Sequence, residues 1–594
     1  MLHKGARHTS SLASLASFAS LVALAALPSL GCGAEAAQHG AAKHPSMKAA
    51  QPFPTRETLD KLAQTPLGAL PARNVAPAAE WSFDTTPVDA PAAVETHFAQ
   101  AATKAGVALT YAKELRCVAR ELARFQLEHE AYPDERLKRF IIASCGLTTS
   151  EVSFAEQRGE APTELTDDKL LAQWQTKLTV PPELKGQVAG VWMGRKGKRV
   201  VIVTAAVKAV GELTVSPADA SGRVEVRGTA PAGTETVLAL VNQGGTGVAR
   251  CEPDLATPLP LFAFHCSMAD GDKTTWIEVA TRAQGRLLLR TLGLALASRD
   301  PSLPIKYAPA VHDAKPAAGG SDLSLAVLEG VNRTRAAAKL APLALAPNQA
   351  ATNQRLAPYF FQAAILSDQA QGDVVGLGLL AGWDVQGTIR DGNLYAALLS
   401  GTGDANAWLD YALEMPMGRF TMLEAAARQI AIGVAPPGTT GGIGAVVTTY
   451  QFFGGSDHRA EAARVFDLMK RTRAARGLPA PAAIPGTKAL GMQAALVNSG
   501  EKDAYDALNT ALGMERDRLR RSVRGWVVAT NDLDSLPFPA ELMRGGPLSV
   551  GVEVTHYREP GAAWGQYIVF LVMEDTGATT PQIQATAVTR DGRL

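Results

Sequence analysis

The chain has 594 residues, of which 46% are hydrophobic and 19% are charged, a composition typical of folded rather than disordered proteins. At roughly 100–200 residues per domain, this length predicts about three to five domains. Lysine and arginine total 58 and aspartate and glutamate total 57, so the formal net charge is +1. This balance, without a clustered basic stripe, excludes the electrostatic signature of a nucleic-acid-binding protein.

The first 32 residues have the features of an export signal. Lys4 and Arg7 supply positive charge before an apolar or small stretch from residue 12 to residue 30. Charge, an apolar run and small residues in this order predict a signal peptide. The run is followed by Gly31 and Cys32, and Cys32 resembles the lipidated cysteine of a bacterial lipobox, although Ser29 stands where leucine is usual. We therefore predict that Cys32 carries a lipid.

The residue after Cys32 bears on location. It is Gly33 rather than aspartate, which in Gram-negative lipoproteins favours export to the outer membrane. The alternative is ordinary signal-peptidase cleavage near residues 34–37, which places the protein at the cell surface or in the periplasm. No other stretch reaches about 18 uninterrupted apolar residues. We predict an exported protein that is attached to a membrane by a lipid anchor. We also predict that it binds an envelope ligand or protein, whose identity the sequence does not give.

The other four cysteines fall into two local pairs, Cys117 with Cys145 and Cys251 with Cys266. An oxidising compartment makes disulfides the expected state of such pairs. Each would stabilise the fold by roughly 3 kcal/mol in the chain-entropy model. Neither pair has the two-residue spacing of a zinc site, so we predict no metal and no cofactor.

Stretches rich in alanine and proline delimit the domains. Residues 33–95 are interpreted as a flexible tether and residues 298–320 as a linker. Residues 455–488 are interpreted as a helix followed by a second linker, and residues 576–594 as a tail.

Two domains are predicted between the tether and the first linker. Residues 96–207 open with a helix whose apolar residues recur every three or four positions, at Leu115, Val118, Leu122 and Phe125. A second helix follows from Pro133, and two strands at 187–192 and 199–204 complete an α+β domain. Residues 208–297 contain seven short β-rich runs, the last at 286–289, separated by turn residues. This pattern predicts an all-β, sandwich-like domain.

Residues 321–454 carry helical patterns first and strand patterns later, which indicates a second α+β domain. Asp404 is expected to cap a helix that bears Trp408, and residues 421–424 have the form of a capping box. Two strands are expected at 429–435 and 446–453.

Several short pieces of this domain, in this order, resemble the CAP superfamily of cysteine-rich secretory proteins, antigen 5 and pathogenesis-related 1 proteins. The pieces are Asn332-x-x-Arg335 with the Leu340-Ala341-Pro342-Leu343 stretch, the alanine-rich helix from Gln349, Trp408-Leu409 ahead of Met415-Pro416-x-x-Arg419, Ile432-Gly433-Val434-Ala435 and Tyr450-Gln451-Phe452. The Met415 to Arg419 piece resembles the family's Ser-Pro-x-His-Arg element. The resemblance spans about 130 of the 594 residues and implies CAP-like α-β-α sandwich architecture.

The polar cleft that the resemblance implies is degenerate. Leu356 stands where the family has its first cleft histidine, and Gly418 stands where it has the histidine of Ser-Pro-x-His-Arg. Gly392 stands where the family has the glutamate of its Gly-Glu-Asn turn, expected here at residues 391–394. None of the ten histidines lies between His312 and His458. This region therefore offers no histidine as a metal ligand or general base, and we expect zinc affinity no tighter than about millimolar.

The order of a helical stretch, a Gly-Val strand and a second β-prone strand occurs three times. The Gly-Val strands are at 189–192, 432–435 and 550–554. We hypothesise that residues 96–207 and 489–575 are degenerate CAP-like units flanking the clearer one. The alternative is that α+β segments commonly end in hairpins. The predicted fold class is thus multi-domain α+β, with CAP-like units and an all-β sandwich-like domain.

The functional interpretation follows from these features. The motifs H-E-x-x-H, G-x-S-x-G, G-x-x-x-x-G-K-[ST] and G-x-G-x-x-G are absent from the sequence. We favour a non-catalytic binding or scaffolding protein of the bacterial envelope. The alternatives are a divergent enzyme that acts on an envelope component through unidentified carboxylates, and a passive envelope structural protein. Carboxylates such as Glu414 and Glu424 are present in the central domain, but surface and cap roles explain them more simply. Two convergent acids with perturbed pKa values in a cleft would favour the enzyme.

Overall fold

A computed structural model describes residues 53–588 of the protein apart from short gaps, the longest of which are 69–73, 90–92, 175–179, 181–183, 209–212, 301–305, 310–319, 436–441, 455–457 and 576–582. The chain forms several separate sheets with helices between them, which confirms the predicted multi-domain α+β class. It divides into two compact bodies. The first comprises 54–380 and 393–449, and the second comprises mainly 381–392 and the chain from 450 onward. No helix within the described residues combines the length and apolarity that crossing a membrane requires.

The N-terminal unit (residues 93–207) is a four-stranded sheet with helices. Its elements are α2 (Ala93–Lys104), β3 (Thr110–Tyr111), α3 (Lys113–His129), α4 (Glu135–Ser144), β5 (Ser153–Glu160), α5 (Asp167–Trp174), β6 (Val188–Lys196) and β7 (Arg199–Val207). The strand order is β3-β6-β7-β5. Helix α3 packs along β6 and β7 through the predicted apolar stripe, all four residues of which are buried. A disulfide joins Cys117 of α3 to Cys145 at the end of α4, as predicted.

The β-sandwich module (residues 213–298) has two four-stranded sheets, ordered β11-β10-β14-β15 and β12-β13-β9-β8. Its strands are β8 (Leu213–Val215), β9 (Arg223–Thr229), β10 (Thr234–Gln243), β11 (Gly247–Arg250), β12 (Glu252–Pro253), β13 (Leu261–Ser267), β14 (Thr274–Ala283) and β15 (Arg290–Ser298). The predicted Cys251–Cys266 disulfide is present. The last strand predicted at 286–289 was placed too early, because β15 pairs with β14 in a register that begins only at Arg290.

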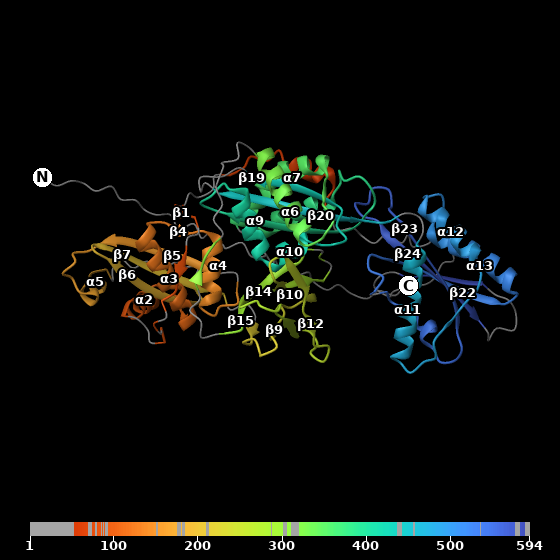
Figure 1. Ribbon diagram of the computed structural model, residues 1–594, viewed down its shortest axis with the longest axis horizontal. Helices are drawn as coiled ribbons and strands as arrows, with labels where there is room; N and C mark the ends of the chain where they lie inside the picture. The colour runs from red at the N-terminus through yellow and green to blue at the C-terminus, as the bar shows by residue number, and fades with distance from the viewer. Residues whose placement is uncertain are drawn as a thin grey trace, which may run out of the picture. The chain divides into compact units, whose positions relative to one another are not determined.

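The central unit (residues 320–452) has helices that precede and interrupt a second four-stranded sheet (Figure 1). Its elements are α6 (Gly320–Ala337), β17 (Ala344–Leu345), α7 (Pro347–Ile365), α8 (Gln369–Ala381), β18 (Ile389–Leu399), α9 (Ala405–Glu414), α10 (Pro416–Met422), β19 (Gln429–Ala435) and β20 (Ile443–Phe452). The strand order is β17-β19-β20-β18, and α6 and α7 pack on β19. Asp404 caps α9 as predicted, because its carboxylate accepts from the Asn406 N–H.

The C-terminal unit (residues 459–588) contains α11 (Arg459–Ala474), β21 (Ala482–Ala483), α12 (Lys488–Asn498), α13 (Ala504–Leu519), β22 (Ser522–Thr530), η2 (Ala540–Met543), β23 (Ser549–Tyr557), β24 (Gln566–Asp575) and β25 (Ile583–Val588). Its sheet has the order β21-β23-β24-β22-β25. Helix α13 packs against β22 and buries Leu508 and Leu512. The Asn531 to Asp534 segment forms a polar turn, in which Asp532 accepts from the Asp534 N–H.

The three α+β sheets share one connectivity. In each, a two-residue strand pairs in parallel with the Gly-Val strand, through Thr110–Val188, Ala344–Gln429 and Ala482–Ser549. The next strand along the chain lies beside the Gly-Val strand, and an earlier strand completes the order. The glycine of the Gly-Val strand allows a helix to approach. A Cβ at Gly190 would lie 2.2 Å from Arg116 N, and one at Gly433 would lie 2.2 Å from Asn353 O.

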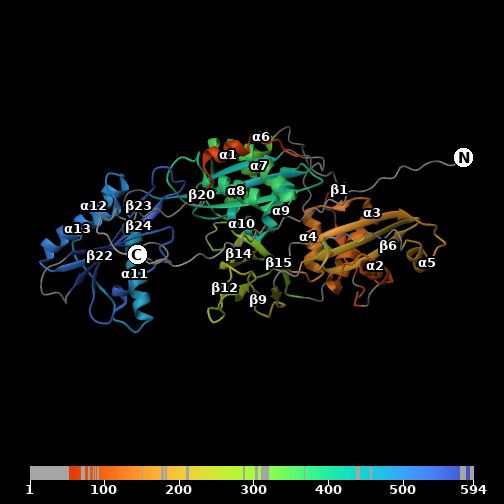
Figure 2. The same ribbon diagram turned by 180° about the vertical axis from the view of Figure 1, so that it is seen from behind.

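Four local expectations need correction. The tether predicted over 33–95 contains α1 (Arg56–Leu62), β1 (Val75–Ala76), β2 (Trp81–Ser82) and the start of α2, and α1 is held because Tyr359 donates to Ala63 O. Figure 2 shows α1 beside α7. The tail predicted over 576–594 contains β25, paired with β22. The turn predicted at 391–394 lies inside β18. The capping box at 421–424 does not start a helix, because α10 ends at Met422.

Candidate functional site

The degenerate cleft positions lie in packed structure. Leu356 on α7 is fully buried, and Gly392 lies half-buried in β18. Gly418 on α10 is buried, and a Cβ there would lie 1.9 Å from the carbonyl oxygen of Ala412. A histidine therefore cannot occupy position 418 without moving the helix backbone. Within the described part of the chain, no group of three or more His, Cys, Asp or Glu residues is placed to hold a metal ion. Cys32 lies outside the described residues.

The Asn-x-x-Arg piece of the central unit joins the end of α6 to two loops. The guanidinium of Arg335 is buried and donates from Nε to Ala341 O at 2.7 Å. Its Nη1 donates to Met422 O at 2.9 Å and to Glu424 O at 3.0 Å. Carbonyl oxygens buried without a donor are costly, so this one side chain holds three backbone segments together. The role of the motif here is structural.

An arginine that the sequence analysis missed repeats this pattern in the C-terminal unit. Arg473 on α11 is fully buried and donates from Nε to Pro479 O at 2.8 Å. Its Nη1 donates to Leu542 O at 2.6 Å and to Arg544 O at 3.1 Å. In both units the first acceptor is six residues after the arginine, and the two acceptors of Nη1 are two residues apart. Arg473 has a fourth acceptor, because its Nη2 donates to Gly546 O at 3.2 Å.

The helices that carry Arg335 and Arg473 both close with a bond from the backbone N–H five residues further on to the carbonyl of the arginine. The same bond also forms to the carbonyls of Ala102, Ile142, Ala363 and Leu496, so it does not single out an equivalent position in the N-terminal unit. An arginine followed after six residues by a Pro-containing turn was the sequence signal that could have identified Arg473.

The α9–α10 element, which carries the Met415 to Arg419 piece, is bonded to the neighbouring modules. Glu414 accepts from Arg136 Nη2 of α4 at 2.9 Å, and its backbone oxygen accepts from Asn242 Nδ2 of β10 at 2.7 Å. Arg419 donates from Nη1 to Gly244 O at 2.9 Å and to Gly247 O at 2.8 Å. The N-terminal unit and the β-sandwich module thus both hold this element.

Two acids of this junction have raised pKa values. Glu278 of β14 is 5% exposed and accepts from the Met417 N–H at 2.9 Å. Burial raises the pKa of Glu278, and hydrogen bonds from Thr291 and Met417 oppose that shift. Burial also raises the pKa of Glu414, and the nearby charge of Arg136 opposes it. Both carboxylates act as hydrogen-bond acceptors inside an interface between modules, which is a structural use.

The other candidate acid, Glu424, bonds within its own turn. Its Oε1 accepts from the Ala426 N–H at 3.0 Å. One hollow among the described residues lies along the exposed face of α11 and is lined by Ala460, Ala463, Arg464, Asp467, Lys470 and Arg471. Its single acid, Asp467, is paired with Lys470 at 3.0 Å. The hollow therefore does not present two converging carboxylates.

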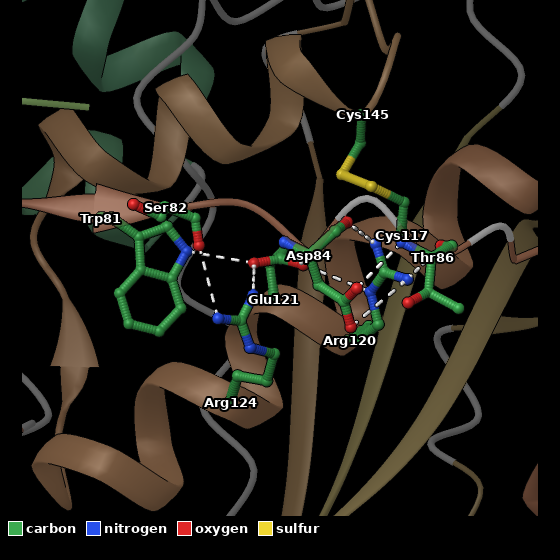
Figure 3. A network of polar contacts seen from close by, with 9 residues as sticks. All are labelled: Trp81, Ser82, Asp84, Thr86, Cys117, Arg120, Glu121, Arg124 and Cys145. Carbon is green, nitrogen blue, oxygen red and sulfur yellow. Dashed lines mark hydrogen bonds and ion pairs between the residues drawn. A yellow bond between two sulfur atoms is a disulfide. The ribbon is translucent and has the colours of Figure 1, made fainter. Parts of the chain in front are cut away.

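A network of charged groups on α3 holds the segment before α2 (Figure 3). The Glu121 carboxylate is buried and accepts from Trp81 Nε1 at 3.1 Å and from Arg124 Nη1 at 2.6 Å. Arg120 lies beside it at 3.2 Å and also donates to the carbonyl oxygens of Asp84 and Thr86. Burial raises the pKa of Glu121, and the charges of Arg124 and Arg120 oppose it. The network fixes the chain segment that enters the N-terminal unit.

Two histidines meet in the C-terminal unit. His458, which precedes α11, is buried, and its Nε2 lies 3.0 Å from Nδ1 of His556 on β23. The ring of Phe453 stacks on His556 at 4.6 Å. Burial, and secondarily the charge of His458, lowers the pKa of His556 to about 4. His556 is thus paired with His458 rather than exposed alone on the strand.

Comparisons with known proteins give a distant match. No protein-family model and no curated protein matches the chain. Among solved structures, the chain is similar to a cysteine-rich secretory protein from Staphylococcus aureus, at 9% identity and a TM-score of 0.18, with 41% of this chain and 86% of that chain covered. It is also similar to an extracellular SCP-domain protein from Bacillus anthracis, at 14% identity and a TM-score of 0.17, with the same coverages.

Proposed function

We propose that the protein is an exported, membrane-anchored and non-catalytic binding or scaffolding protein of the bacterial envelope. One observation carries the proposal. The α9–α10 element, where the CAP resemblance implies a histidine, has Gly418 against a backbone carbonyl and is bonded to two other modules through Glu414 and Arg419. The polar side chains of this element, Glu414 and Arg419, therefore bond to other domains and do not line a cleft. Two disulfides fit an oxidising, exported setting.

The domain boundaries form part of this proposal. We infer that the N-terminal and C-terminal units are degenerate copies of the central unit, because all three share a strand order. The matching carbonyl acceptors of Arg335 and Arg473 support the inference for two of them. A chain of three such units and a β-sandwich module offers several separate surfaces, which suits a scaffold.

Anchoring and scaffolding are tested separately. Palmitate labelling and membrane fractionation of the protein and its Cys32→Ser variant test the anchor. We expect the variant to lose the label and leave the membrane fraction, and an unlabelled parent protein would contradict lipidation.

The enzyme alternative is tested by complementation of a deletion strain. Two variants are tested, Asp391→Asn and Glu424→Gln. Each replaces a carboxylate of the central unit that does not belong to the junction between domains. A scaffold retains its function in both. A folded variant that fails to complement would favour an enzyme that uses that carboxylate.

A further inference from the structure

An apolar loop projects from one end of the β-sandwich module, between β12 and β13. Leu255 is 91% exposed, Leu261 is 54% exposed and Leu259 is 44% exposed. Residues 255–261 read Leu-Ala-Thr-Pro-Leu-Pro-Leu and contain no charge. Large apolar side chains clustered at the surface mark a site of interaction, because leaving them in water is unfavourable.

The loop is fixed in its shape and satisfies much of its own backbone. The Cys251–Cys266 disulfide closes its base. The carboxylate of Asp254 accepts from the Ala256 N–H at 3.0 Å and from the Thr257 hydroxyl at 3.0 Å. The Thr257 N–H bonds to Asp254 O, and Leu261 lies in the ladder between β13 and β9. The two prolines have no N–H to satisfy.

These features distinguish between two kinds of apolar partner. Protein interfaces draw their strongest contacts from tryptophan, tyrosine and arginine, and leucine is under-represented among them. Residues 255–261 contain none of the three favoured types. Hydrocarbon, in contrast, accepts leucine readily and disfavours charge and free backbone N–H groups. Residues 255–261 have no charge, their two prolines have no N–H, and the N–H groups of Ala256 and Thr257 are bonded to Asp254, so this tip fits hydrocarbon better.

We propose that the 254–261 loop inserts its leucines into the surface of a lipid bilayer. The contact is reversible and holds the β-sandwich module at the membrane, in addition to the anchor at Cys32. The proposal depends on the proposed function only in requiring that the protein be near a membrane. A fixed loop loses little conformational freedom on insertion, which favours binding by a small apolar tip.

The test uses the chain without residues 1–31 and with Cys32→Ser, so that no lipid contributes. Partition into phosphatidylcholine vesicles is measured by sedimentation, at low and at high salt. We expect binding that changes little with salt, and at least a tenfold loss in the Leu255→Asp/Leu259→Asp variant. The matched control is Leu366→Asp, because Leu366 is 57% exposed elsewhere in the chain. It should change partition by less than twofold.

A label reports insertion directly. An environment-sensitive fluorophore on Ala256→Cys should shift to shorter wavelength with vesicles, and one on Gly403→Cys should not. Absence of vesicle binding, or equal binding by the Leu255→Asp/Leu259→Asp variant, would overturn the proposal. A dimer in sedimentation that depends on Leu255 would overturn it in favour of a second copy. Failure of palmitate labelling at Cys32 with intact vesicle binding would overturn the anchor alone.

Discussion

The central and C-terminal units differ in what their polar residues do beyond the shared framework. In both, a buried arginine at the end of the first helix binds three backbone carbonyls with the same spacing, and Arg473 binds a fourth, Gly546 O. In the central unit, further polar groups of α9 and α10 bond to neighbouring modules. In the C-terminal unit, a histidine pair packs beside Phe453. The buried arginine, Arg335 or Arg473, is thus common to the central and C-terminal units, whereas their other polar residues make different contacts.

The difference shows which positions hold the unit together. The arginine compensates buried carbonyls, and in the central unit the glycine of the Gly-Val strand admits helix α7, so the packing of the backbone requires both residues. Positions 356 and 418 are also filled by packing: Leu356 is buried, and a Cβ at Gly418 would lie 1.9 Å from Ala412 O.

The largest effect is expected from removing either framework arginine. Arg335→Met and Arg473→Met each leave at least three carbonyls without a donor, which should lower the free energy of unfolding by about 3–5 kcal/mol. Urea unfolding followed by circular dichroism measures the loss. The controls are Arg333→Met and Arg471→Met, on the exposed faces of the same helices. A large loss at Arg335 and none at Arg473 would break the correspondence between the two units.

Restoring the family's histidine should destabilise the central unit. Gly418→His places a Cβ within 1.9 Å of the Ala412 carbonyl oxygen, so we expect a loss of about 3 kcal/mol. The control is Gly403→His, because no atom lies within 4 Å of a Cβ at that position. Calorimetric zinc titration of both variants should find no site tighter than about millimolar. A stable Gly418→His protein with micromolar zinc affinity would show that the cleft persists.

The junction acids offer a smaller effect. Glu414→Gln leaves the buried guanidinium of Arg136 without a charged partner, which should cost about 2–4 kcal/mol. The matched variant Glu424→Gln removes a carboxylate that bonds only within its own turn and should change stability by less than about 0.5 kcal/mol. Thermal unfolding compares them. Equal losses would mean that Glu414 does not join the central and N-terminal units.

The features predicted correctly from the sequence are those that depend on residues close together in the chain. The α3 stripe, the Asp404 cap and the two disulfides depend on short spacings and are present. Strands such as β5 and β18 were missed because their residues become β-like only through pairing with β7 and β20. Alanine- and proline-rich composition suggested a tether over residues 33–95, yet within it single residues such as Trp81 bond to distant partners.

The candidate site shows the same limit. The resemblance points to Leu356 and Gly418 from the sequence alone, but the sequence does not reveal how tightly each is packed. The bond between Glu414 and Arg136 joins residues 278 positions apart, and the spacing of neither helix indicates it. Arg473 could have been found by comparison with Arg335, because the six-residue interval to a Pro-containing turn is visible in both stretches.

The smallest effect tests the histidine pair. The pKa of His556 is lowered from 6.5 to about 4 in the folded chain, so the folded state binds the proton less readily than the unfolded state. Stability from this group is therefore complete above pH 6.5 and is lost as the pH falls toward 4. Because the side chain is only partly buried, we discount the shift and expect about 1–2 kcal/mol.

The groups that face the pair set the design of this last experiment. Asn498 bonds to His556, Glu461 lies 3.8 Å from His458, and Arg390 contacts Tyr567 beside them. Carboxylates elsewhere also titrate below pH 5, so only the difference between parent and His556→Gln is informative. We expect the variant to lose about 1–2 kcal/mol less stability than the parent between pH 7 and pH 4. His265→Gln is the control, and equal pH dependence of parent and His556→Gln would exclude the pair as a titrating element of the C-terminal unit.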